Sequence, residues 1–415
     1  MNARWLMMVL CCSPLAGASS QDAGTSCHVS IAQAPRRLQL PDGRTVSTDV
    51  KSVATSHGTV MAVGDLAYVF PAGATPRADA VMRDSIIGFI INANGVSMVP
   101  KPPGVVRVSY PRVVAAPGGS FHMLFATTAD NQNGLTRSDT ATIWYARYVD
   151  NRWTTPERVQ ETRGAQLLTE TASQLLERDN ELAFLFPHNT SGSRGLVLLR
   201  RRENRWIADT LRTTAEPRSV AAVHASDGSL VAAFTMSGRA VNPAYTDVLF
   251  TARFRSSWSI PQYAGGTTRP VGMAKLLPVG DTIVATWIEW MWGDANTSQL
   301  QWRRLGIDSS AMPVASGRTT YPFEALALND RHPIWLLRGV QYGASLAPLI
   351  GTESTVESLA TLEVPFENPK ANAVVVSDGR VLVLTMKQGK LPDEPMVASY
   401  ATVLQFRCPQ PARRE

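Results

Sequence analysis

The sequence lacks the features that mark helical, metal-binding and nucleic-acid-binding proteins. Charged residues make up 18% of the 415 residues, below the usual share of about a quarter. No long stretch repeats apolar residues at helical spacing, and lysine and arginine form no concentrated block. We therefore expect neither a helical fold nor a nucleic-acid ligand. The six histidines and four cysteines show no metal-ligand spacing, so we also expect no metal and no cofactor.

Long hydrophobic runs are equally scarce. The first twenty residues, MNARWLMMVLCCSPLAGASS, contain one early cation, an apolar run and then small residues. This layout is typical of a secretory signal cleaved near Ala18 to Ser20, and it is too short for a membrane span. A lipid anchor on Cys11 or Cys12 is the alternative, although Leu10 stands where a small residue is usual. No later segment is long and apolar enough to span a membrane, so we expect a secreted, periplasmic or extracellular protein.

Two of the four cysteines fall in the predicted signal, which leaves Cys27 and Cys408 near the ends of the mature chain. An oxidising compartment favours a single disulfide between them. Two buried free thiols are the alternative.

Valine, threonine and tryptophan are frequent, and 29 glycines and 27 prolines punctuate the chain, which favours β structure. Residues 110–159 read as four strands joined by tight turns, one of them at Asp150-Asn151, and by one long polar loop. The same order recurs along the chain, with tryptophan after the last turn in DNRW, ENRW and RSSW. Aligned first strands place these residues in one column: Lys51, Arg112, Ala172, Arg218, Pro270, Phe323 and Lys370.

Repeats of about fifty residues, each too small to bury both faces of its sheet, indicate an all-β propeller with four-stranded antiparallel blades. Seven copies favour seven blades, and six remain possible if the loose first copy, 49–70, belongs elsewhere. The last copy supplies only three strands, so we expect residues 27–33 to add the fourth and to bring Cys27 to Cys408. The predicted boundaries are a signal at 1–20, an N-terminal segment with the closing strand at 21–44, the propeller at 45–408 and a tail at 409–415.

The segments PRVVAAP (111–117), SDGSLVAAF (226–234) and YARYVDNRWTTP (145–156) resemble the blades of the sialidase-like propeller superfamily. The resemblance extends over most of residues 45–408. The turn at 148–153 lacks the serine and glycine of the Asp box that sialidases carry. The resemblance implies a carboxylate clamp of three arginines, and Arg112, Arg218 and Arg269 hold comparable blade positions.

The first-strand column begins at the mouth of the expected channel, where its cations would form a basic rim. These cations are Lys51, Arg112, Arg218, Arg269 and Lys370. Such a rim would hold a carboxylate, sulfate or phosphate group. In the alternative interpretation the same cations are solvated or paired with neighbouring glutamates.

A second candidate site is WIEWMW (287–292), in which Trp287, Glu289 and Trp292 combine aromatic rings with a carboxylate. Aromatic faces beside polar groups suit sugar recognition. The alternative is that these tryptophans fill the space between blades, as we expect of Trp153, Trp206 and Trp258.

The leading hypothesis is a secreted propeller that binds an acidic glycan or another anionic ligand at its loop face. A sialidase-type glycoside hydrolase is the first alternative. It would need a Tyr nucleophile beside a carboxylate, such as Glu289, and an opposed acid. A protein-interaction scaffold is the second alternative.

Overall fold

The structure is a computed structural model. It describes residues 27–70, 81–82, 86–128, 140–163, 173–190, 193–236, 247–265, 271–290, 298–308, 312–328, 332–339, 348–351, 356–358, 371–377, 379–387 and 398–408. The predicted signal and the C-terminal tail lie outside these ranges. None of the described segments forms a helix with the length and hydropathy that a membrane crossing requires.

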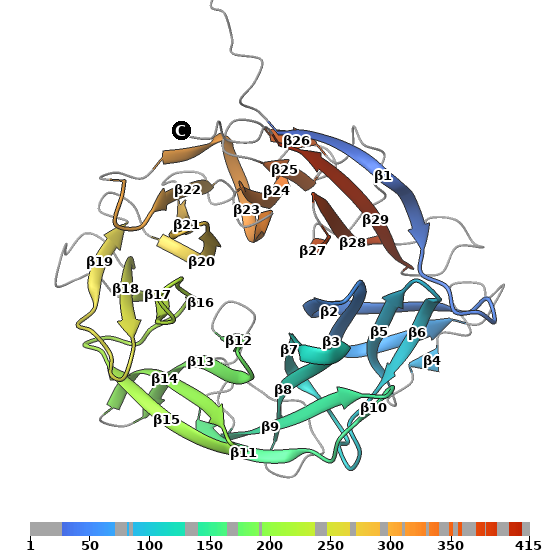
Figure 1. Cartoon of the computed structure of the whole chain (residues 1–415), viewed down its shortest axis with the longest axis horizontal. Helices are drawn as coiled ribbons and strands as arrows, with labels where there is room; N and C mark the ends of the chain where they lie inside the picture. Colours follow the sequence, from blue (N-terminus) through green and yellow to red (C-terminus); the bar gives the residue numbers. More distant parts are fainter. Residues whose placement is uncertain are drawn as a thin grey trace, which may run out of the picture.

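The described strands form six antiparallel sheets, and Figure 1 shows them arranged as a ring around a common axis. We number the first five in chain order and call the sixth the closing sheet, because it joins the two ends of the chain. In each sheet, the strand that comes first in its repeat lies nearest the axis (Figure 1). This arrangement confirms the predicted all-β propeller with four-stranded antiparallel blades.

The first three sheets occupy residues 45 to 212. Sheet 1 contains β2 (Thr45–Ser56), β3 (Thr59–Phe70), β4 (Val81–Met82), β5 (Ile86–Asn92) and β6 (Gly95–Pro100). Sheet 2 contains β7 (Ser109–Ala116), β8 (Ser120–Thr128), β9 (Thr140–Val149), β10 (Arg152–Trp153) and β11 (Glu157–Arg163), with the short 3-10 helix η1 (Pro117–Gly119) between its first two strands. Sheet 3 contains β12 (Gln174–Arg178), β13 (Glu181–Thr190), β14 (Ser193–Arg202) and β15 (Arg205–Arg212).

The remaining sheets complete the ring. Sheet 4 contains β16 (Val220–His224), β17 (Leu230–Met236), β18 (Val248–Phe254) and β19 (Gln262–Gly265). Sheet 5 contains β20 (Val271–Val279), β21 (Thr282–Trp290), β22 (Ser298–Arg304), β23 (Met312–Leu328), β24 (His332–Gly339), β25 (Pro348–Gly351) and β26 (Val356–Ser358). The closing sheet contains β27 (Ala371–Ser377), β28 (Arg380–Lys387), β29 (Ala398–Arg407) and β1 (His28–Arg37).

The prediction of seven separate blades is wrong as a count of sheets, because the fifth and sixth repeats share one strand. The first part of β23 pairs with β22, with Thr319 opposite Ser298. Its last part pairs with β24, with Glu324 opposite Leu336. The two repeats therefore form one seven-stranded sheet. The loose first repeat forms a sheet of its own, so the count of six arises for a different reason from the one expected.

The ends of the chain close the ring as predicted. Strand β1 pairs antiparallel with β29, with His28 opposite Arg407 and Ile31 opposite Leu404. The Cys27–Cys408 disulfide joins the ends of these two strands. Pairing β1 with the last repeat covers a sheet edge that would otherwise expose unpaired backbone groups.

The recurring tight turns form where the sequence places asparagine or aspartate. Asp150 and Asn151 both have positive φ angles, 51° and 60°, which the two central positions of a type I′ hairpin turn require. Two residues after this turn, Trp153 is 6% exposed, and its Nε1 donates a hydrogen bond to the Pro100 carbonyl of sheet 1 at 2.8 Å. Trp153 therefore packs against the neighbouring sheet, as predicted.

Hydrophobic side chains fill the space between neighbouring sheets. Seven clusters of buried residues are present in the described residues, and each lies where two sheets or the two halves of sheet 5 face each other. Between the halves of sheet 5, the rings of Trp302 and Trp335 lie 5.8 Å apart. Burial at these interfaces is the main stabilising contribution, because each apolar side chain that leaves water contributes about 1.5–3 kcal/mol.

Ring closure predicts a large contribution of the disulfide to stability. Because the bond closes a loop of 381 residues, replacing Cys27 and Cys408 by serine should lower the free energy of unfolding by about 4–5 kcal/mol. Urea denaturation of the oxidised protein and of the double variant measures the difference. Added reductant should shift the midpoint of the oxidised protein and leave that of the double variant unchanged. Equal urea midpoints for the oxidised protein and the double variant would contradict this role.

Candidate ligand-binding site in the central channel

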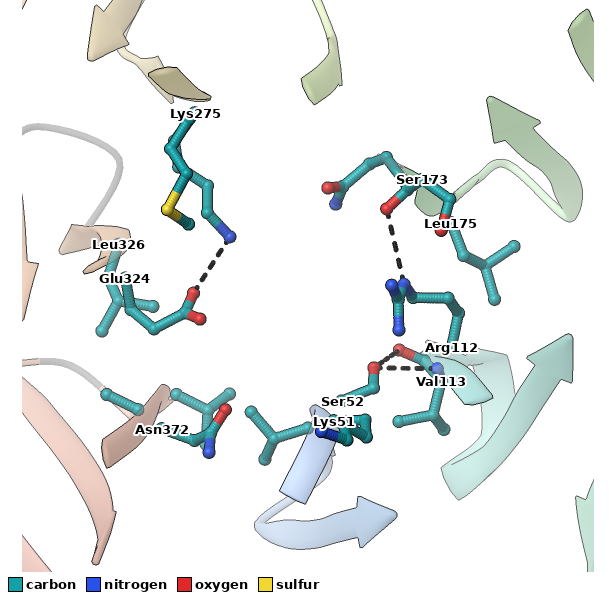
Figure 2. Close-up of a pocket in the computed structure, with 15 residues that line it drawn as sticks. Lys51, Ser52, Arg112, Val113, Ser173, Leu175, Lys275, Glu324, Leu326 and Asn372 are labelled. Atoms are coloured by element: carbon teal, nitrogen blue, oxygen red, sulfur yellow. Dashed lines mark hydrogen bonds and ion pairs between the residues drawn. The ribbon is translucent and has the colours of Figure 1, made fainter. Parts of the chain in front are cut away.

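A cavity of about 230 Å³ lies on the axis of the ring, where the innermost strands converge. Strands β2, β7, β20, β23 and β27 contribute to its wall, together with β12 and the residue before it. Figure 2 shows the polar side chains that face it from several directions. These polar residues are Lys51, Ser52, Arg112, Ser173, Gln174, Lys275, Glu324 and Asn372.

Polar and apolar side chains together form the cavity wall. Side chains two positions apart on a strand point to the same face of the sheet. On four of the innermost segments, a polar residue is followed two positions later by an apolar one that also lines the cavity. The pairs are Lys51 and Val53, Ser173 and Leu175, Glu324 and Leu326, and Asn372 and Val374. The cavity therefore offers charge, hydrogen bonding and apolar contact.

Irregular backbone occurs in the innermost strands next to the charged residues. Lys51 is an extra residue in the pairing of β2 with β3. Tyr110 in β7 and Met273 in β20 sit at similar irregularities, with φ angles of 51° and 37°. Strand β23 loses its regular pairing just before Glu324. Bulges re-aim the side chains that follow them, and positive φ at such residues costs about 1–3 kcal/mol.

Hydrogen bonds between neighbouring sheets surround the cavity and hold its wall in place. Asn372 Nδ2 donates to the Val50 carbonyl at 3.4 Å, and the Val113 N–H donates to Ser52 Oγ at 3.0 Å. Arg112 Nε donates to the Ser173 carbonyl at 3.4 Å, and the Ala274 N–H donates to Ser219 Oγ at 2.9 Å. Because the partners belong to different sheets, the positions of the lining side chains depend on the whole ring.

Two predicted rim residues, Lys51 and Arg112, line the cavity. Arg112 is 7% exposed, and its Nη1 donates to the Pro111 carbonyl at 2.9 Å. Lys51 Nζ lies 2.8 Å from Asp49 Oδ2. Neighbouring groups thus hold both cations in a fixed geometry. This favours ligand recognition, because little side-chain freedom is lost on binding.

The structure adds a third cation that the sequence analysis missed. Lys275 Nζ lies 3.3 Å from Glu324 Oε2, and both side chains line the cavity. Among the lining residues, three cationic side chains therefore face one carboxylate. Since Asp49 pairs with Lys51 and Glu324 pairs with Lys275, the excess is the one positive charge of Arg112, and it favours an anionic ligand.

One of the other predicted rim residues is among the described residues, and it does not line the cavity. Arg218 lies away from the lining, with 65% of its side chain exposed, and its Nη1 pairs with Asp247 Oδ2 at 3.0 Å. Burial raises the pKa of the Asp247 carboxyl, and the charge of Arg218 opposes that rise. Arg269, Lys370 and Trp292 lie outside the described residues.

The second candidate site is mainly a packing feature. Trp287 is fully buried in the cluster between sheets 4 and 5, so its ring face is not available to a sugar. Its Nε1 donates to Glu289 Oε1 at 3.2 Å, which confirms that the two side chains share a face of β21. A side chain at Gly265 would collide with the Trp287 ring. This tight fit explains a glycine at the end of β19.

A histidine and a tyrosine, both on sheet 2, form a separate polar pair where this sheet faces sheet 3. His122 Nδ1 and Tyr145 Oη lie 2.7 Å apart, and their rings are stacked. The Arg201 guanidinium lies 4.5 Å from the centre of the Tyr145 ring. Burial lowers the pKa of His122 to about 4, with Arg147 and Arg201 adding to the effect. His122 is therefore neutral at pH 7, and it does not line the channel cavity.

One group of potential metal ligands is present in the described residues: Cys27, His332 and Cys408. Both cysteines are in the disulfide, so their sulfur atoms are not available as thiolates.

No protein-family model matches the chain, and no curated protein matches it. Among solved structures, the chain is similar to the polysaccharide lyase Uly1, with 10% identity over 86% of this chain and 90% of that chain and a TM-score of 0.49. It is also similar to a PL25 ulvan lyase, with 11% identity, 90% and 96% coverage and a TM-score of 0.47. A GH93 α-L-arabinofuranosidase of Fusarium graminearum shares 10% identity, with 73% and 95% coverage and a TM-score of 0.45. Similarity of this degree does not determine what the chain binds.

The neutral state of His122 predicts a dependence of stability on pH. Its pKa is about 4 in the folded chain and 6.5 in an unfolded one, so the unfolded state binds more protons between these values. Stability is therefore lost as the pH falls from about 6.5 to 4. Glutamine does not titrate, so the His122→Gln variant should lose about 1–2 kcal/mol less stability than the wild type over this pH range. This value is reduced because the His122 side chain is partly exposed to solvent. Urea denaturation at pH 7.5 and 4.5 measures it, and identical pH dependence in both proteins would refute it.

Proposed function

We propose that this chain is a binding protein whose central channel holds the acidic group of a glycan. One observation carries the proposal: Lys51, Arg112 and Lys275, from three different sheets, line one cavity that contains a single carboxylate. Guanidinium and ammonium groups are the usual partners of carboxylates and sulfates. Bulged strands next to these residues support a role in recognition, because bulges are frequent beside binding sites.

The mixed polar and apolar lining of the cavity favours a saccharide over a simple inorganic anion. Asn372 and Gln174 provide amide groups for ligand hydroxyls, and the apolar side chains of the lining suit the C–H face of a sugar ring. A volume of about 230 Å³ is below the range of about 300–1,000 Å³ that is common for larger ligands. One charged sugar unit therefore fits this cavity better than a whole oligosaccharide, whose other units would extend outside.

Binding is favoured over sialidase-type hydrolysis by the composition of the lining. That mechanism needs a tyrosine nucleophile and two carboxyl groups. In the described lining, Glu324 is the only carboxylate and no tyrosine is present. Incubation with a fluorogenic sialoside should therefore release product at the rate seen in buffer alone.

We also propose that the protein works outside the cytoplasm. The Cys27–Cys408 disulfide supports this location, since such bonds persist in oxidising compartments. The predicted signal at residues 1–20 agrees with it.

Glycan binding by the purified protein and its variants tests the proposal. We expect binding to glycans that carry uronic acids or sulfates and not to their neutral counterparts. Lys275→Met and Lys51→Met each remove one charge from the cavity at nearly constant volume. Each should weaken binding by about tenfold or more, since a charge-assisted hydrogen bond contributes about 1.5–3 kcal/mol.

Arg218→Met is the matched control, because it removes one charge from a residue that was predicted for the rim but lies outside the cavity lining. It should change the affinity by less than about twofold. The absence of acidic-glycan binding by the wild type, or an equal effect of the control and Lys275→Met, would overturn the proposal.

A further inference from the structure

The repeated tryptophan follows the last tight turn in sheets 2, 3 and 4. Trp153 belongs to the cluster between sheets 1 and 2, Trp206 to that between sheets 2 and 3, and Trp258 to that between sheets 3 and 4. Each ring therefore fills space at the boundary with the preceding sheet. Sheet 5 should need a comparable ring at its boundary with sheet 4.

Sheet 5 has no tryptophan at this place. The chain after β22 continues as Leu305, Gly306, Ile307 and Asp308, and the next tryptophan in the sequence is Trp335. A cavity of about 450 Å³ opens between sheets 4 and 5, and Leu305 and Gly306 are part of its lining. We call it the inter-sheet cleft. The cleft thus lies at one of the boundaries that lack the repeated tryptophan. The boundaries of the closing sheet with sheets 1 and 5 lack it too, and at the boundary of sheets 4 and 5 the buried tryptophan is Trp287 of β21.

Polar side chains from both sheets face the inter-sheet cleft. Thr251 and Arg253, two positions apart on β18, line it from sheet 4, and Arg303 lines it from β22. Gln262 and Tyr263 of the short strand β19 complete the outer wall. Nearby, Ile260 is 85% exposed, and Tyr263 is 39% exposed. The cleft combines cations, an amide, a hydroxyl and apolar surface, and the described lining contains no carboxylate.

Arg303 is the lining residue with an unpaired buried hydrogen-bond donor among the described residues. Its Nε is buried and has no hydrogen-bond partner in the described part of the chain. The adjacent Arg304 holds Asp308 through both Nε and Nη2, so this carboxylate, whose charge also acts on Arg303, is already paired. Arg253 likewise pairs with Asp227 at 2.9 Å. Burying a donor without a partner is unfavourable, so the hydrogen-bonding capacity of the Arg303 guanidinium is not fully used within the described residues.

We propose that the inter-sheet cleft is a second binding site, for a saccharide unit that carries a carboxylate or sulfate group. The acidic group binds Arg303, ligand hydroxyls bind Thr251 and Gln262, and the apolar face of the ring lies against Tyr263. The cleft shares no lining residue with the central channel. This site therefore stands on its own residues, whether or not the channel binds a ligand.

Isothermal titration calorimetry with three probes tests the second site. The probes are trigalacturonate for carboxylates, a heparin-derived disaccharide for sulfates and maltotriose as the neutral control. Wild-type protein should bind at least one acidic probe and not maltotriose. If both proposed sites are occupied, two molecules bind each chain, and Lys275→Met leaves the one bound in the inter-sheet cleft.

Two variants probe the inter-sheet cleft, and one serves as the control. Arg303→Met should weaken cleft binding by about tenfold or more, the effect of one lost charge-assisted hydrogen bond. Leu305→Trp restores a large ring at this boundary and should abolish cleft binding. Arg304→Met removes the same charge one position along, outside the lining, and should change affinity by less than about twofold.

The outcomes separate this site from the channel. A single bound molecule that is lost with Lys275→Met but kept with Arg303→Met and Leu305→Trp overturns the second site and leaves the channel proposal standing. A single molecule lost with Arg303→Met and kept with Lys275→Met supports the second site and overturns the channel. Equal effects of Arg303→Met and Arg304→Met would also overturn the second site. Thermal unfolding of each variant confirms that the ring is intact.

Discussion

Packing between neighbouring sheets is the constraint on which the whole molecule depends. A four-stranded sheet cannot bury both of its faces by itself, so each sheet needs a neighbour on either side, and only a closed ring provides one for every sheet. The pairing of β1 with β29 and the Cys27–Cys408 disulfide satisfy this need at the ends of the chain. Closure also fixes where the innermost strands meet, and so it creates the channel cavity.

The same constraint explains where binding groups can lie. Faces of the sheets are occupied by apolar packing, as the buried Trp287 shows. Polar side chains gather instead on the axis, beside bulges in β2, β7 and β20, and in the cleft between sheets 4 and 5. Both places are departures from the regular repeat, and such departures often accompany function.

Sequence reasoning predicted the features that follow from local rules. The turn at Asp150-Asn151, the packing of Trp153 and the disulfide depend on turn chemistry, repeat position and cysteine count. It missed the sharing of β23 by two repeats, because repeat spacing does not show whether a strand continues unbroken. It missed Lys275 because the bulge at Met273 shifts the alternation of β20. Of the predicted rim residues, Lys51 and Arg112 line the axial cavity and Arg218 does not, because a first-strand position alone does not determine where a side chain points.

A crystal structure of the protein with an acidic trisaccharide would show directly whether the axial cavity binds an acidic group. We expect electron density for a carboxylate or sulfate group in this cavity, within hydrogen-bond distance of Lys51, Arg112 or Lys275. An empty axial cavity in crystals that bind the trisaccharide elsewhere, or an acidic group that points away from these three cations, would contradict it.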